Sequence, residues 1–328
     1  YGWGFVAAAI GMVFGLAVFQ SLRSWLGHVG ANHPGREGWT PVFQVLAGAA
    51  VLTVPVFFLL SKSDVLGGVL ALMLVGLAVY FVLSGVRSGE KVQLHRYIAM
   101  LILFVGNMVF WALFEQAGSS LNFLAEAHVN MPEGEWLPGF LKHFSVFQSV
   151  NAVFIVAIAP VIAALWPWLE KRSINPSIPR KFAIGLVMVG AGFAVLVFAI
   201  KSFVADGAKI SWVWLTLTYL VHTVAELCIS PIGLSMVTKL ARPKETGLAM
   251  GGWFLSIAVA NYAAGKIAAI ATGGEKAVEG VAPKVLSMGE KLSQYQDVFL
   301  QLTFAGLIVG ALYFALAPQV NKLMHGVK

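Results

Sequence analysis

The sequence predicts an all-α integral membrane protein, and three observations carry that prediction. Of its 328 residues, 59% are hydrophobic and only 11% are charged, whereas about a quarter of the residues in a soluble domain are charged. The mean hydropathy is +0.82. Runs such as residues 69–83 are apolar on every side, which favours membrane helices over barrel strands of alternating polarity. These features exclude a soluble enzyme or a DNA-binding module.

Nine runs are long enough to cross a hydrocarbon core of about 30 Å as helices. Short connections rich in Gly, Pro and charged residues separate them. In chain order, the runs cover residues 3–20, 43–61, 65–86, 97–125, 146–169, 182–204, 211–238, 247–271 and 298–318.

The net charge of +7 is explained by topology. Numbering the connections alternately places fourteen Lys and Arg residues on one face and seven on the other, with four and eight acidic residues, respectively. Cytoplasmic loops carry the excess of basic residues, so the basic face and the C-terminus are predicted to be cytoplasmic. The charge therefore gives no reason to expect a nucleic-acid partner.

The start of the chain and its single cysteine supply two further expectations. It starts without Met and without the basic region of a signal peptide, so we expect it to begin partway through a longer protein. The lone cysteine, Cys228, lies in an apolar run and is expected to be a buried small hydrophobe.

Glu115 is one of a few ionisable residues inside the runs, where charge is costly and usually faces a cavity or a partner. At helical spacing it shares a face with Trp111, Phe114, Asn107 and Gly118. This mixture of aromatic, acidic, amide and glycine residues is typical of a cavity lining. The alternative is a carboxylate paired with another helix for packing alone.

Glu226 is the second acid within a run. Together with His222 and Ser230 it lines one helical face, because these residues recur at intervals of four. Pro231 has no amide hydrogen and leaves the Leu227 carbonyl without its helical partner, so a kink is expected beside the acid. The alternatives are a proline bend with a paired Glu and, for His222, a packed helix residue.

The remaining candidates are three uncharged residues and one lysine in two other runs. Trp253 and Asn261 share a face in residues 247–271, although Trp253 alone could be an interfacial residue. Lys266 is expected to extend toward the interface, and Asn151 adds an amide one turn into the fifth run. No phosphate-binding loop, hydrolase elbow or zinc motif occurs, so no metal or organic cofactor is predicted.

Three stretches resemble the proton-dependent oligopeptide transporter family of the major facilitator superfamily. They are residues 2–12 (GWGFVAAAIGM), 110–122 (FWALFEQAGSSLN) and 226–240 (ELCISPIGLSMVTKL), which occur in order along most of the chain.

The resemblance implies the fold and its divisions. Residues 1–26 would be the last helix of an N-terminal half, 27–96 a linker with an inserted two-helix hairpin, and 97–328 the C-terminal six-helix bundle. The first five helices of such a transporter, with its first-helix arginine, would then be missing from this chain. The hairpin has no charged residues in its two runs, so we expect it to face lipid outside the cavity.

The resemblance also implies roles for individual residues. Glu226 would hold the amino terminus of a peptide, with Asn151 hydrogen-bonding nearby, and Glu115 would exchange a proton. Trp111, Phe114, Ser230 and Trp253 would line the pocket. No cofactor beyond the coupling proton is implied.

The function expected from these features is that of a proton-coupled symporter, not an enzyme, importing di- and tripeptides by alternating access. The expected location is the bacterial inner membrane, crossed many times. The alternative is a major facilitator exporter of organic cations or drugs, in which the same acids would bind the cation. A membrane-embedded transferase is disfavoured, because Glu115 and Glu226 lie within their runs and not at the interface.

Overall fold

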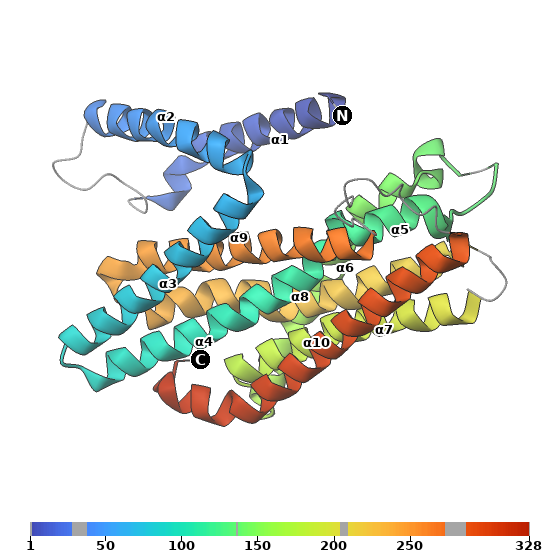
Figure 1. The fold of residues 1–328 in the computed structure, drawn as a ribbon. Helices are drawn as coiled ribbons and strands as arrows, with labels where there is room; N and C mark the ends of the chain where they lie inside the picture. Colours follow the sequence, from blue (N-terminus) through green and yellow to red (C-terminus); the bar gives the residue numbers. More distant parts are fainter. Residues whose placement is uncertain (1, 28–37, 136, 204–208, 273–286, 328) are drawn as a thin grey trace. The chain divides into compact units, whose positions relative to one another are not determined.

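The computed structural model describes residues 2–27, 38–135, 137–203, 209–272 and 287–327. The described chain is almost entirely helical (Figure 1), which confirms the predicted all-α class. It divides into two compact units, Tyr1–Leu66 and Gly67–Lys328, each described by itself. The finer division expected at residues 26 and 96 stays a prediction.

The first unit contains α1 (Gly2–Ser21), the short 3-10 helix η1 (Arg23–Leu26) and α2 (Thr40–Leu60). Both long helices are apolar. Pro41 lies in the first turn of α2, where its missing amide hydrogen costs nothing.

The second unit holds the remaining helices. The long ones are α3 (Ser63–Arg87), which begins in the first unit, α4 (Lys91–Phe114), α6 (Phe147–Lys171), α7 (Ile178–Phe203), α8 (Trp212–Leu240), α9 (Thr246–Ala271) and α10 (Met288–Leu323). Short elements connect them: η2 (Glu115–Gly118), α5 (Ser120–His128), η3 (Gly139–Lys142), η4 (Phe144–Val146) and η6 (Pro243–Glu245). Strands β1 (Val129–Asn130) and β2 (Ile210–Ser211) pair in parallel.

Eight helices in the described residues are long and apolar enough to cross a membrane, and the described part of the first run, Phe5–Ser21, forms a shorter apolar helix. Each predicted run other than residues 97–125 therefore corresponds to one helix. The last helix is longer than its apolar run of residues 298–318, because Ser287 and Glu290 form a capping box at its start. This chain is a multi-pass membrane protein.

The run at residues 97–125 differs from the single helix that was expected. Helix α4 ends at Phe114, η2 follows, and α5 starts at Ser120. The hydroxyl of Ser120 donates to the Gln116 side chain at 2.7 Å, and that amide donates to the carbonyl of Ala264 on α9 at 3.3 Å. These polar contacts hold the interrupted backbone against a neighbouring helix.

The core of the second unit is built on close helix contacts. Helix α7 packs most extensively on α10, and Figure 1 shows the two side by side. Gly190 of α7 and Gly306 of α10 meet at this crossing, where a Cβ on Gly306 would lie 2.7 Å from the Gly190 Cα. Small residues of this kind allow two membrane helices to approach closely.

The second helix of the predicted hairpin, α3, differs from the expectation that it faces lipid alone. Phe81 is fully buried, with its ring centroid 5.0 Å from that of Tyr97 on α4. A Cβ on Gly252 of α9 would clash with Leu77. Helix α3 therefore packs on α4 and α9 through one face.

Candidate functional site

Asn151 and Glu226 meet between α6 and α8. The Asn151 amide nitrogen donates to a Glu226 carboxylate oxygen at 3.0 Å and also contacts the Thr223 hydroxyl oxygen at 3.1 Å. The Thr223 hydroxyl donates to the Tyr219 carbonyl one turn earlier at 2.7 Å. The Asn151 amide of α6 thus holds the Glu226 carboxylate close to Thr223, one turn earlier on α8.

The helix positions explain this meeting. Asn151 lies one turn after the start of α6 at Phe147, and Phe147 stacks on Tyr219 of α8 with 6.0 Å between ring centroids. The Tyr219 hydroxyl donates to the carbonyl of Ala117 in η2 at 3.2 Å. The same aromatic pair therefore ties α6, α8 and the interruption after α4 together.

Glu115 lies at that interruption, as the first residue of η2. Its side chain is half-buried, and within the described part of the chain its carboxylate makes no hydrogen bond. Phe114, beside Glu115, packs against His222 of α8 with 6.2 Å between ring centroids, and His222 lies one turn before Glu226. The elements that carry the two acids are therefore neighbours.

An aromatic group precedes Glu115 on α4. The ring of Phe114 lies 5.3 Å from that of Trp111 and 5.4 Å from that of Phe110, between centroids. It also lies 6.2 Å from the ring of His222 on α8. The Trp111 indole nitrogen is buried without a hydrogen-bond partner, so one donor in this group is unused.

His222 is held by packing. Its Nε2 lies 3.0 Å from the Val189 carbonyl oxygen, and the side chain is 1% exposed. A Cβ on Gly192 of α7 would lie 2.3 Å from the imidazole ring. The imidazole fills the space that this glycine leaves, as the packed-helix alternative expected.

Ser230 lies one turn after Glu226 on α8, and its hydroxyl oxygen is buried without a partner. Trp253 is placed differently. It is 2% exposed, and its ring packs against those of Phe104 and Phe182. A Cβ on Gly233 would overlap the indole, so Trp253 lies in the packed interior, two turns beyond Glu226 along α8.

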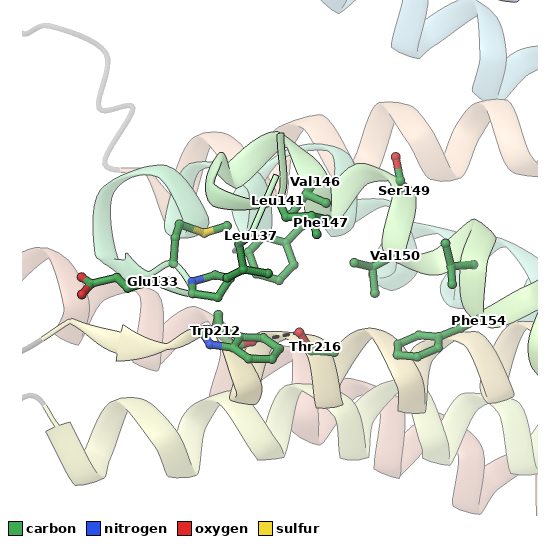
Figure 2. Close-up of a pocket in the computed structure, with 13 residues that line it drawn as sticks. Glu133, Leu137, Leu141, Val146, Phe147, Ser149, Val150, Phe154, Trp212 and Thr216 are labelled. Atoms are coloured by element: carbon green, nitrogen blue, oxygen red, sulfur yellow. Dashed lines mark hydrogen bonds between the residues drawn. The ribbon is translucent and has the colours of Figure 1, made fainter. Parts of the chain in front are cut away.

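A cavity of about 530 Å³ lies against α6 and α8, and Figure 2 shows residues that line it. It is largely apolar, with Val150 and Phe154 from α6 and Trp212 and Thr216 from α8 in its wall. Glu133 lines it, but Glu115, Glu226 and Asn151 do not. This cavity is therefore separate from the carboxylate site.

Glu245, in η6, is a buried acid that lies between the predicted runs 211–238 and 247–271 and is not among the predicted site residues. It is 5% exposed. One carboxylate oxygen accepts from Ser84 at 2.6 Å and from Tyr80 at 3.2 Å, and the other accepts from Tyr97. The signal in the sequence was an acid just before an apolar run, which is typical of a helix start.

Three further observations concern side chains considered in the sequence. Cys228 is buried and unpaired, as expected. The Lys266 ammonium lies 5.4 Å from the centroid of the Tyr262 ring. Across the described ranges, no three His, Cys, Asp or Glu residues are grouped so as to hold a metal ion.

Comparison with known proteins gives consistent matches. A family model described as "PTR2: POT family" matches residues 1–284. "Uncharacterized transporter YclF" of Bacillus subtilis is 30% identical over 339 residues, which cover 100% of this chain and 62% of that protein. "Peptide transporter YePEPT" of Yersinia enterocolitica is 29% identical, covering 99% of this chain and 63% of the relative.

Solved structures match over the same part. The crystal structure of "peptide transporter POT in complex with sulfate" superposes with a TM-score of 0.70 at 28% identity, covering 99% of this chain and 63% of that one. A structure of a variant of peptide transporter POT in complex with alafosfalin also gives a TM-score of 0.70. This chain spans a little under two thirds of the length of these relatives.

Proposed function

We propose, since this chain belongs to the POT family, that it forms part of a proton-coupled symporter that imports di- and tripeptides. Its fold is that of the major facilitator superfamily, and its relatives are transporters and not enzymes. The similarity to peptide transporter YePEPT supports the substrate class. Alternating access would bring the site to each side of the membrane in turn.

The contact between Asn151 and Glu226 is the observation that carries this proposal. A peptide's terminal ammonium needs a fixed anion once water is removed, and a carboxylate supplies a charge-assisted hydrogen bond. The amide of Asn151 donates to one carboxylate oxygen, which leaves acceptor sites on Glu226. We assign Glu226 to the peptide amine and Asn151 to the orientation of its carboxylate.

Glu115 is proposed to carry the proton. Its carboxylate makes no hydrogen bond with the described residues, and Phe114 beside it packs against His222, one turn before Glu226 on α8. Two neighbouring carboxylates resist being ionised together, so a proton on Glu115 would favour the ionised form of Glu226 that binds an amine. This interaction supplies a physical link between the proton and the peptide.

The remaining assignments concern the pocket and the membrane. Trp111, Phe114 and Ser230 are proposed to line the substrate path, where aromatic walls accept many side chains, whereas Trp253, which packs against Phe104 and Phe182 in the interior, is not assigned to it. The unpartnered donors of Trp111 and Ser230 are suited to bind a substrate or water. The N-terminal half of the transporter would supply the other wall. We place the protein in a bacterial inner membrane, with the basic connections and the C-terminus cytoplasmic.

A substrate comparison tests the site assignment. Uptake of a radiolabelled dipeptide into proteoliposomes is measured in competition with unlabelled dipeptide and with its N-acetylated form. We expect the free amine to compete and the acetylated peptide to compete poorly. Equal competition by both would show that no carboxylate recognises the amine.

A second comparison tests the proton role. Glu115→Gln should abolish uptake driven by a proton gradient while retaining gradient-free counterflow of peptide. Glu126→Gln is the matched control, because Glu126 is exposed on the adjacent α5. If Glu115→Gln still concentrates peptide when the interior is alkaline, the proton uses another group.

A further inference from the structure

A second, polar cavity lies away from the carboxylate site, at the ends of several membrane helices. It has a volume of about 470 Å³, and Tyr80, Leu83, Ser84, Arg87, Ser88, Arg242, Lys244 and Glu245 line it. Arg87 is the last residue of α3, and η6 joins the end of α8 to the start of α9. The cavity is therefore at the level where these membrane helices reach the polar interface.

The charges of this cavity favour an anion. Three cations, Arg87, Arg242 and Lys244, line the cavity together with a single carboxylate, that of Glu245. The carboxylate opposes an anion, but its oxygens already accept hydrogen bonds from Ser84, Tyr80 and Tyr97. The lining thus keeps an excess of two positive charges.

Arg242 supplies an observation independent of the charge count. One terminal nitrogen of its guanidinium is buried and has no hydrogen-bond partner. A buried donor without a partner is costly, and such groups in native proteins usually serve a ligand, an ion or water. A guanidinium matches the geometry of phosphate oxygens through parallel hydrogen bonds.

We propose that this cavity binds a phosphate group, and that the phosphate is the headgroup of an anionic membrane lipid. Arg242 would make the central contact, and Arg87 and Lys244 would hold the flanking oxygens. The position at the helix ends favours a lipid over a free phosphate ion, because the headgroup lies at that depth. All three cations belong to the face predicted to be cytoplasmic, where anionic lipids attract basic residues.

This site would join α3 to the connection between α8 and α9. Tyr80 and Ser84 of α3 bind Glu245, while Arg242 and Lys244 flank it in the chain. A bound phosphate would bridge Arg87 of α3 to Arg242. The proposal does not depend on the identity of the transported substrate.

The test uses native mass spectrometry of the purified full-length protein with added phosphatidylglycerol and, in parallel, diacylglycerol, which lacks the phosphate. We expect phosphatidylglycerol to bind and diacylglycerol not to. Arg242→Gln should weaken phosphatidylglycerol binding about tenfold, and Lys244→Gln about fivefold. Arg180→Gln is the control, because Arg180 is exposed on the same predicted face outside the cavity.

Competition identifies the source of the phosphate. Excess inorganic phosphate should fail to displace phosphatidylglycerol. If inorganic phosphate binds and lipid does not, the phosphate chemistry stands and the lipid source is wrong. Arg87→Gln is a second variant in case Arg242→Gln does not fold. Unchanged lipid binding in every folded variant would overturn the proposal.

Discussion

Glu226 and Glu245 are two carboxylates removed from water in different ways. Glu245 has both oxygens engaged by hydroxyl groups from α3 and α4 and is almost fully buried. Glu226 is half-buried and receives one hydrogen bond from a neighbouring helix, that of Asn151. Since a carboxylate offers about four acceptor sites, the first is largely satisfied by the protein and the second is not.

The difference separates a structural acid from an acid available to a ligand. Three hydroxyl donors fix Glu245 in place, and loss of the carboxylate would leave those donors without a partner. The free acceptor sites of Glu226 suit a substrate cation. Position within an apolar run is therefore a weaker guide to function than the number of hydrogen bonds that the protein itself provides.

The largest effect is expected at Glu226. Glu226→Gln keeps the shape and removes the charge, and losing a charged hydrogen-bond partner costs about 1.5–3 kcal/mol, or roughly ten- to a hundredfold in peptide affinity. Thermal stability in detergent should stay close to that of the wild type. Binding of a dipeptide to the purified full-length protein, with Glu126→Gln as control, measures the change. Unaltered affinity would show that Glu226 does not bind the peptide amine, and the proposed difference between Glu226 and Glu245 would be wrong.

Glu245→Ala should have the opposite profile. It leaves the hydroxyls of Tyr97 and Ser84 without their acceptor, and we expect a loss of stability of about 2 kcal/mol. Peptide affinity in the fraction that remains folded should be unchanged. Thermal unfolding in detergent is compared with that of Glu90→Ala, because Glu90 is exposed and makes no side-chain cap bond. A specific fall in affinity at full stability would reverse the roles of the two acids.

Asn151→Ala sharpens the comparison at the proposed peptide site. It removes the donor that orients Glu226 and should weaken peptide affinity by about 1 kcal/mol, or roughly fivefold. The effect should be smaller than that of Glu226→Gln, since the anion remains. Ser149→Ala is the control, because Ser149 is exposed on the same helix. The orienting role is wrong if Asn151→Ala binds peptide as tightly as this control.

The smallest effect is expected at Ser84. Ser84→Ala removes one of three donors to Glu245 and should lower stability by about 0.5–1 kcal/mol. Ser202→Ala is the reference, because its hydroxyl bonds only the Phe198 carbonyl of its own helix. Thermal unfolding of the two variants, side by side, shows whether Ser84 contributes more than an ordinary helix serine. Equal melting temperatures would indicate that Tyr97 and Tyr80, and not Ser84, hold the Glu245 carboxylate.

The helices could be predicted because length and apolarity decide membrane spans. The interruption after Phe114 could not, since residues 97–125 are apolar enough to continue and the break depends on Gln116 reaching the Ala264 carbonyl of a distant helix. Tertiary contacts of this kind leave no periodic pattern. The end of the α-helix is visible only from the side-chain contacts of the folded protein.

The carboxylate site could be predicted only in part, because some of its residues are recognisable only from tertiary contacts. Glu115 and Glu226 stood out because charge is rare within apolar runs. Thr223, which shares the Asn151 amide with Glu226, did not stand out among many hydroxyl residues. Glu245 was missed because its partners Tyr80 and Tyr97 come from segments about 150 residues earlier in the chain.

The contact between Gly190 and Gly306 has a consequence for how this sequence changes over evolution. Each glycine occupies space that a side chain on the other would need, because a Cβ on Gly190 would lie 2.8 Å from the Thr303 carbonyl oxygen and one on Gly306 equally close to the Gly190 backbone. A larger residue at either position would force the helices apart along their whole crossing. We therefore expect an alignment of homologous sequences to show small residues at both positions, and replacements at one to be accompanied by compensating changes at the other.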